Sequence, residues 1–139
     1  MKPQEIIEKL QKYKWEKHNI EYVMVFGSCL TQYNFHDIDL AIKFTKYSFD
    51  EYVNLLEGLS NYLKIREDHI DIVILNNENL PAQLILEIYT KGRLIYCHNY
   101  EEYLNEALRR INVSYDFLID FKKLKVLETA LKRVKEKWA

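Results

Sequence analysis

Glycine is scarce in this sequence, with 3 glycines among 139 residues, whereas glycine usually makes up about 7% of a protein. A nucleotide site built from a glycine-rich loop is therefore not expected. The two cysteines, Cys29 and Cys97, lie far apart and form no CxxC pair, so neither a disulfide framework nor a zinc site is expected. The histidines show no metal-ligand spacing, and we interpret all four as ordinary surface or half-buried residues: His18, His36, His69 and His98.

Long apolar runs are also missing. None approaches the ~20 residues that span a bilayer, and residues 1–5 do not begin a signal peptide. We therefore expect a cytoplasmic protein with no membrane partner. Charge of one sign does not dominate either, because the formal net charge is −1. Residues 21–98 nevertheless carry eleven acidic and six basic residues, a balance that favours a cation site and predicts no direct nucleic-acid partner.

The sequence does contain enough apolar residues for one folded domain. Hydrophobic residues make up 48% of the chain, which excludes disorder, and no linker or repeat divides it. Four segments have the pattern of strands: Ile20–Phe26, Asp37–Phe44, Ile70–Leu75 and Arg93–Cys97. Helices are predicted from Pro3, from Phe49 with Ser48 as its cap, and from Pro81. We predict an α+β fold, a small mixed sheet of four or five strands with packed helices.

A long C-terminal helix is predicted from residue 100, either as one piece or as two helices end to end. Two apolar stripes step by four and three residues on either side of a phase shift near Phe121: Leu104, Leu108, Ile111, Tyr115 and Leu118, then Leu124, Leu127, Leu131, Val134 and Trp138. The first stripe fits a helix that covers its own sheet as well as one that needs a partner. The second is too long for so small a sheet. The last nineteen residues carry seven basic and two acidic side chains, which fits a solvated face or docking to an acidic partner or RNA.

Three carboxylates and a Gly-Ser pair carry the predicted chemistry. Asp37 and Asp39 alternate onto one face of a strand, which is costly unless a cation compensates their charge. Asp71 lies in the middle of the next strand. Gly27 and Ser28 follow the strand Ile20–Phe26, where glycine lets the backbone approach a ligand and serine can cap the next helix. Together these residues predict a site for Mg²⁺ and the phosphates of a nucleotide.

These residues resemble a known family. The sequence is similar to minimal nucleotidyltransferases (MNT) of the DNA polymerase beta superfamily, the antitoxin branch that pairs with HEPN toxins. The resemblance rests on Val25-Phe26-Gly27-Ser28, on Asp37-Ile38-Asp39, and on Ile70-Asp71-Ile72. It covers nearly the whole chain, and implies one nucleotidyltransferase domain over residues 1–139, with a catalytic core at 1–98 and a helical extension at 99–139.

The resemblance also implies a reaction and its residues. Gly27 and Ser28 would hold the triphosphate of ATP. Asp37, Asp39 and Asp71 would be the catalytic residues and would bind two Mg²⁺ ions, with Asp71 also helping to deprotonate the attacking hydroxyl. The expected product is a HEPN toxin adenylylated on tyrosine, with release of pyrophosphate. The C-terminal helix would then form a homodimer or a hetero-oligomer with the toxin.

The sequence departs from the family pattern after Ser28. Leu30, Thr31 and Gln32 stand where the family has Ala-Arg-Gly, the loop from Cys29 to His36 is short, and His36 replaces a serine. These departures leave two other functions open. One is a catalytically weak antitoxin that acts by binding and occlusion. The other is a small-molecule nucleotidyltransferase whose acceptor pocket is shared across a dimer.

Overall fold

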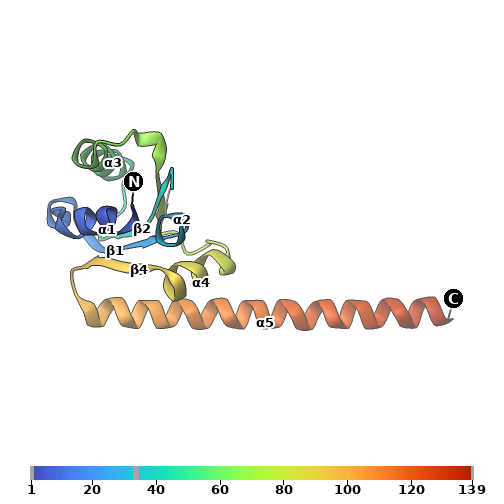
Figure 1. Ribbon diagram of the computed structural model, residues 1–139. Helices are drawn as coiled ribbons and strands as arrows, with labels where there is room; N and C mark the ends of the chain where they lie inside the picture. The colour runs from blue at the N-terminus through green and yellow to red at the C-terminus, as the bar shows by residue number, and fades with distance from the viewer. Residues whose placement is uncertain (1, 33–34, 139) are drawn as a thin grey trace.

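A four-stranded mixed sheet forms the centre of the molecule (Figure 1). The computed structural model describes residues 2–32 and 35–138, with the side chains of the last two helical residues left aside. The strands are β1 (Ile20–Phe26), β2 (Ile38–Phe44), β3 (Ile70–Ile74) and β4 (Arg93–Cys97), in the order β3-β2-β1-β4. β1 is antiparallel to β2 and to β4, whereas β2 and β3 are parallel. The predicted fold class is therefore confirmed.

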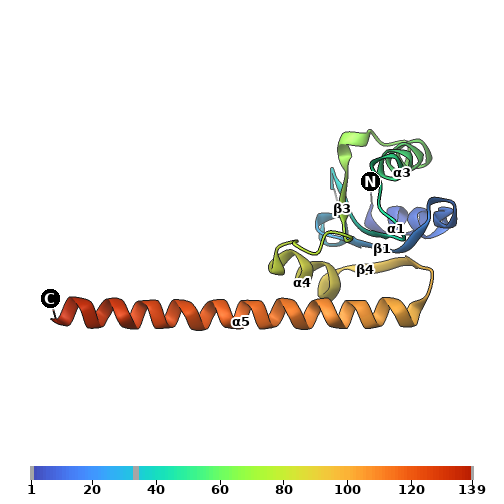
Figure 2. The same cartoon turned by 180° about the vertical axis from the view of Figure 1, so that it is seen from behind.

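Alternation along the strands buries both faces of the sheet. Val23, Leu40 and Ile42 point into a core formed with α1 (Pro3–Lys12), the 3₁₀ helix η1 (Trp15–His18) and α3 (Phe49–Leu63). Met24 and Ala41, which alternate with them, point into a second core on the opposite face. α4 (Ala82–Lys91) and α5 (Tyr100–Trp138) cover that second face. Figure 2 shows the resulting layers, with α1 and α3 on one side of the sheet and α4 and α5 on the other.

The short elements follow local signals in the sequence. Ser48 caps α3, where its Oγ accepts a hydrogen bond of 3.1 Å from the amide of Glu51. α2 (Ser28–Thr31) follows β1, and η2 (Glu67–His69) leads directly into β3. The loop predicted from Cys29 to His36 includes residues 33 and 34, which lie outside the described residues. Cys29 and Cys97 are both free thiols.

α5 is one continuous helix of 39 residues, and its packed face decides between the two alternatives left open for the first stripe. The buried residues are Tyr103, Ala107, Arg110 and Ser114. Of the first stripe, Leu108 and Tyr115 are 57% and 50% exposed, whereas Ile111 packs against the second core, so the stripe as a whole does not cover the sheet. The packed face combines Tyr103 with two small side chains and one arginine. The Arg110 guanidinium donates to the carbonyls of Leu75 and Asn77 at 2.6 and 2.9 Å.

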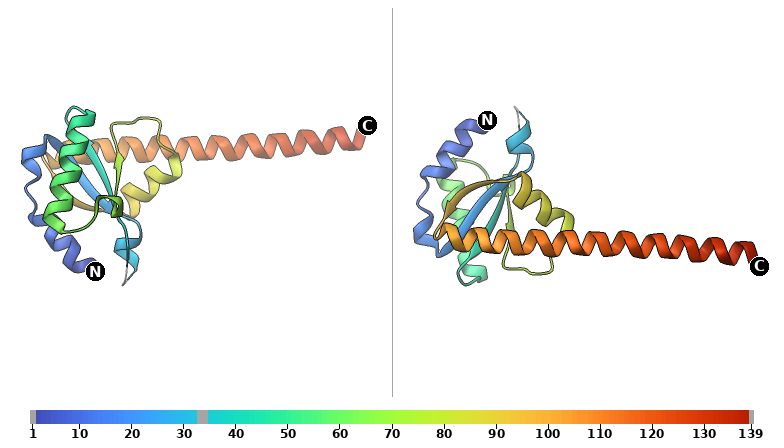
Figure 3. Two further views of the ribbon diagram at one scale, coloured as in Figure 1. Left: turned by 90° about the horizontal axis from the view of Figure 1, so that it is seen from above. Right: turned by 90° about the horizontal axis from the view of Figure 1, so that it is seen from below.

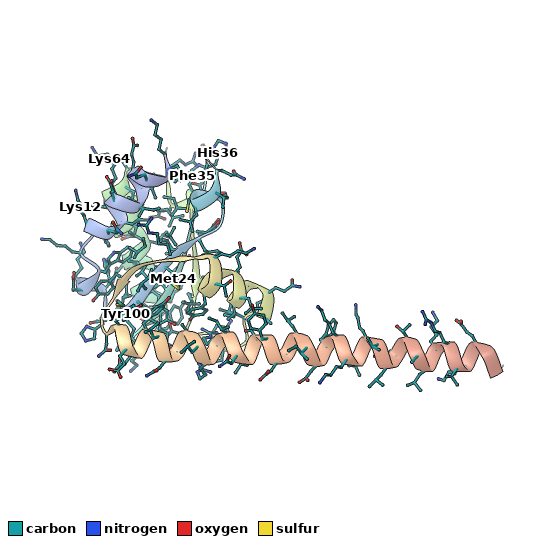
Figure 4. All side chains as sticks on the ribbon, turned by 60° about the horizontal axis from the view of Figure 1, so that its bottom comes forward. Lys12, Met24, Phe35, His36, Lys64 and Tyr100 are labelled. Atoms are coloured by element: carbon teal, nitrogen blue, oxygen red, sulfur yellow. The ribbon has the colours of Figure 1, made fainter. Side chains whose placement is uncertain are left out.

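Beyond Ser114, α5 leaves the domain and projects into solvent as residues 115–138, called the arm below (Figure 3). At 1.5 Å per residue the arm is about 36 Å long, which agrees with the prediction that this part is too long for the sheet. Figure 4 shows its side chains radiating on all sides, whereas Met24 lies inside the domain. No helix in the described ranges 2–32 and 35–138 has the length and apolarity needed to cross a membrane. The predicted cytoplasmic location and the division at residue 98 stay predictions.

Candidate active site

The register of β2 and β3 brings the acidic residues together at one side of the sheet. Asp39 of β2 is paired directly with Asp71 of β3 in the parallel ladder, and residues paired in this way point to the same face. Asp37 lies two residues before Asp39 and therefore on the same face. The face is that of the second core, because Ala41 of β2 and Val73 of β3 continue it inward. The structure thus places all three predicted carboxylates side by side.

Gly27 lies against Asp39 at the end of β1. Its neighbour Phe26 is paired with Asp39 across the β1–β2 ladder, and Gly27 adopts a positive φ of 79°. A Cβ atom at this position would overlap the Oδ2 atom of Asp39. Glycine is therefore required here for two reasons, the left-handed backbone conformation and the close approach of the carboxylate.

Ser28 does not have the role that the sequence predicts for it. The cap of α2 is Gly27, and this helix start has no side-chain cap hydrogen bond. Ser28 is instead the first residue of the helix, because the turn is made by the unusual backbone of Gly27. Its hydroxyl is not engaged in capping and lies next to the glycine that contacts Asp39. The Gly-Ser pair still adjoins the carboxylates.

The carboxylates repel one another. Burial raises the pKa of Asp39 to about 6, and the neighbouring charges of Asp71, Asp37 and Glu87 add to the increase. Glu87 comes from α4, on the same face of the sheet. A carboxylate surrounded in this way favours either a proton or a cation. This patch therefore attracts positive charge.

His69 is a neighbour of the site that the sequence analysis set aside as an ordinary histidine. Its Nδ1 atom lies 3.0 Å from Oδ1 of Asp37, and both side chains are about half exposed. The signal that could have found it is spacing. His69 precedes Asp71 by two residues, as Asp37 precedes Asp39, and β2 and β3 run parallel with Ile38 opposite Ile70. Equal spacing on parallel strands places His69 opposite Asp37.

The donor set fits a hard cation that is completed by a ligand. Across the described residues, no three His, Cys, Asp or Glu side chains form a group that could hold a metal ion by themselves. In the same residues, neither Asp39 nor Asp71 has a Lys or Arg ion-pair partner. Mg²⁺ is usually held by one or two carboxylates together with substrate phosphates rather than by a cage of protein ligands. Asp37, Asp39 and Asp71 fit that type of site.

The segment after Ser28 brings no basic side chain to this side of the molecule. α2 has no basic residue, and Gln32 follows it as the C-cap residue. Leu30 and Thr31 belong to the helix. The guanidinium that the family pattern has in this segment is thus not replaced by another cation within α2.

Comparison with solved structures identifies the same fold in toxin–antitoxin complexes. One chain comes from a tri-AMPylated Shewanella oneidensis HEPN toxin in complex with MNT antitoxin. It is 18% identical, with 92% of this chain and 95% of that chain covered at a TM-score of 0.59. Another comes from a toxin–antitoxin structure with AMP-PNP, 18% identical, covering 94% of this chain and 99% of that chain at a TM-score of 0.61. At these identities the likeness concerns the fold.

The sequence itself carries a family assignment. A search of curated proteins found no match. The family described as "Polymerase beta, Nucleotidyltransferase" matches residues 4–101, which span every strand, the Gly-Ser pair and all three carboxylates. The superfamily predicted from the sequence is therefore confirmed. The chain belongs to the polymerase beta nucleotidyltransferase family.

Proposed function

We propose that this protein is the antitoxin of a HEPN/MNT toxin–antitoxin pair and a Mg²⁺-dependent protein adenylyltransferase. It would move AMP from ATP to a tyrosine hydroxyl of the toxin and release pyrophosphate. The observation that carries the proposal is the meeting of Asp37, Asp39 and Asp71 beside Gly27 in a nucleotidyltransferase fold. The similarity in fold to complexes of MNT antitoxin with an AMPylated HEPN toxin and with AMP-PNP supports it.

The residues would act by positioning and by moving one proton. The backbone at Gly27 and the Ser28 hydroxyl would hold the triphosphate, since no side chain at position 27 blocks the approach. Asp71 would accept the proton of the acceptor hydroxyl while the oxygen of that hydroxyl forms a bond to the α-phosphorus. The bond between the α-phosphorus and its bridging oxygen then breaks, and pyrophosphate leaves. Asp37, Asp39 and Asp71 would hold Mg²⁺, which would supply charge compensation for the phosphates.

The acceptor site would be completed by a partner. The family match covers residues 4–101, and the arm of α5 extends beyond the sheet domain as a bare helix (Figure 1). The toxin would therefore bring its own acceptor segment to Asp71. The arm would serve a homodimer or a hetero-oligomer with the toxin.

An antitoxin that acts by occlusion is the second candidate. The observation that favours it is the segment Leu30-Thr31-Gln32, which lacks the basic residue that the family pattern has near the phosphates. In that case binding alone would neutralise the toxin, and the nucleotide site would be vestigial. A dimeric small-molecule nucleotidyltransferase remains a third proposal.

One assay separates the first two candidates. The protein is mixed with labelled ATP, Mg²⁺ and the HEPN protein encoded beside it, and label on the toxin is measured. We expect label on a toxin tyrosine, and we expect the variant Asp37→Asn with Asp39→Asn to lose labelling while it still forms the complex. If the double variant protects cells as well as the unaltered protein does, occlusion is the function.

A further inference from the structure

Six apolar side chains of α5 from Val113 onward form one line along the helix, whereas Tyr115, Ile119 and Val126 lie on other sides of it. The six recur at spacings of three and four residues, except between Phe117 and Leu124, which are seven apart with Asp120 at the intermediate position. These spacings place them on one side of the helix. We call this line the distal seam: Val113, Phe117, Leu124, Leu127, Leu131 and Val134. Each of them is between 53% and 62% exposed, for example Leu127 at 60% and Leu131 at 62%. Nothing in the described part of the chain covers this line.

The distal seam begins at a cavity in the domain surface. The cavity has a volume of about 380 Å³ and lies between α5 and the start of α4. Its lining includes Val113 and Phe117 from the seam, and Pro81, Ala82 and Ile85 from α4. A cavity that adjoins an exposed apolar helix face suits an amphipathic helix with one large anchoring side chain.

Charge selects the kind of partner. The last nineteen residues carry seven basic and two acidic residues. At 100° per residue, Lys123 and Lys135 flank the seam on its two sides. Two copies of the arm packed along each other would double this positive excess within a Debye length of about 8 Å. A partner helix with acidic flanks would instead neutralise it.

We infer that the distal seam and its cavity are the docking surface for an amphipathic helix with acidic flanks, supplied by the toxin. This inference rests on the proposed function. It adds that the toxin is held at the arm, away from the three carboxylates, and that its acceptor segment reaches Asp71 from there. Docking and chemistry then use separate residues of the chain.

The separation predicts a particular kinetic result. A change in the distal seam weakens binding of the toxin equally in the ground state and in the transition state. KM for the toxin therefore rises, and kcat is unchanged. The variant Leu127→Glu with Leu131→Glu tests this. Loss of two buried anchors at the centre of an interface predicts an about thirtyfold rise in Kd and KM for the HEPN protein.

The control variant puts the same charges on the opposite side of the arm. Val126→Glu with Thr129→Glu changes residues that lie at the same level, with Val126 68% exposed, and should leave Kd unchanged. A second pair tests the charges. Lys123→Gln with Lys135→Gln should weaken binding and reduce its salt dependence, whereas Lys122→Gln with Lys125→Gln, farther from the seam, should do so less.

The measurements are isothermal titration calorimetry with the HEPN protein, AMP transfer at several toxin concentrations, and analytical ultracentrifugation of the chain alone. A monomer whose seam variant binds the toxin weakly and keeps kcat supports the inference. A dimer of the chain alone that the seam variant dissociates would overturn it, because a second copy would then cover the seam. Unchanged toxin binding by the seam variant would also overturn it. If no AMP is transferred but the seam variant still loses the toxin, the proposed AMP transfer fails, whereas the antitoxin role and the inference stand.

Discussion

The sheet domain and the arm of α5 use apolar side chains in opposite ways. In the domain, side chains that alternate along the strands are fully buried on both faces of the sheet, such as Leu40 on one face and Ala41 on the other, both at 0% exposure. In the arm, leucines at regular helical spacing are more than half exposed. The pattern up to Ser114 is thus explained by contacts within the chain. The pattern beyond it has no explanation there, and points to a contact with another molecule.

We expect the candidate active site and the arm to differ most in their response to the loss of one carboxylate. We expect Asp39→Asn to reduce AMP transfer to the toxin at least about a thousandfold, because the site would lose one of three converging charges. The same change should not lower the thermal unfolding midpoint measured without Mg²⁺. Burial and the neighbouring carboxylates raise the pKa of Asp39 to about 6, so its charge opposes folding at neutral pH.

The matched control for Asp39 is Asp116→Asn on the exposed arm. It should leave both AMP transfer and the unfolding midpoint unchanged. An equal loss of AMP transfer in the two variants would show that Asp39 contributes no more to the reaction than an exposed carboxylate on the arm. A large fall in the midpoint of Asp39→Asn would contradict the repulsion described for the site.

Leucine truncation compares the two regions directly. Leu59 in α3 is 0% exposed and Leu131 in the arm is 62% exposed. Leu59→Ala should lower the free energy of unfolding by about 2–5 kcal/mol, because it opens a cavity in the core. Leu131→Ala should change it by no more than about 0.5 kcal/mol. Urea denaturation of the isolated chain measures both, and similar losses for the two variants would mean that the arm is packed in solution.

Gly27→Ala tests the junction between β1 and the carboxylates. A Cβ atom would overlap Asp39 at a backbone with φ of 79°, so we expect a loss of about 1–3 kcal/mol in unfolding free energy. AMP transfer should fall with it, since Asp39 is displaced. Adding Asp39→Ala to Gly27→Ala removes the overlap and should restore part of the stability. No recovery in the double variant would assign the whole cost to the backbone conformation.

The smallest expected effect concerns the pH dependence of stability, which involves the core formed with α1, η1 and α3. His18 is buried, and its Nε2 atom lies 2.7 Å from the Tyr13 hydroxyl. Burial, followed by the charge of Lys17, lowers the pKa of His18 below its ordinary value. The unfolded chain therefore binds a proton more readily than the folded one, so stability is complete above about pH 6.5 and decreases as the pH falls. Denaturation of the unaltered protein and of His18→Gln from about pH 8 to about pH 5 measures this, and an equal slope for both would exclude His18 as the cause.

Much of the domain could be predicted because its residues alternate. The strands Ile20–Phe26 and Arg93–Cys97 have the predicted bounds, and Ser48 caps α3 as predicted. Spacing also placed Asp37 and Asp39 on one face. The contact between His69 and Asp37 was missed because its signal, the equal spacing of His69 from Asp71 and of Asp37 from Asp39, applies only when the two strands are known to be parallel and in this register.

One prediction failed, and one open alternative was decided, because of a local contact that the pattern does not show. Ser28 has the residue type of a helix cap, but the positive φ of Gly27 makes Gly27 the cap. The stripe from Leu104 to Leu118 has regular spacing, but α5 packs through Tyr103, Ala107 and Arg110 instead. Periodicity shows that a helix has apolar sides and does not show which side its own domain covers.

The buried guanidinium of Arg110 joins α5 to the carbonyls that follow β3. A cut after residue 98 would remove this donor from the backbone oxygens of Leu75 and Asn77 and would expose Tyr22 and Met24, which Tyr103 of α5 contacts. We therefore expect the minimal folded unit to extend through Ser114 and shorter fragments to be less stable. The arm, in contrast, is not needed for the folded unit. Shortening it behind Ser114 should yield a soluble enzyme fragment that still carries all three carboxylates and the glycine beside them.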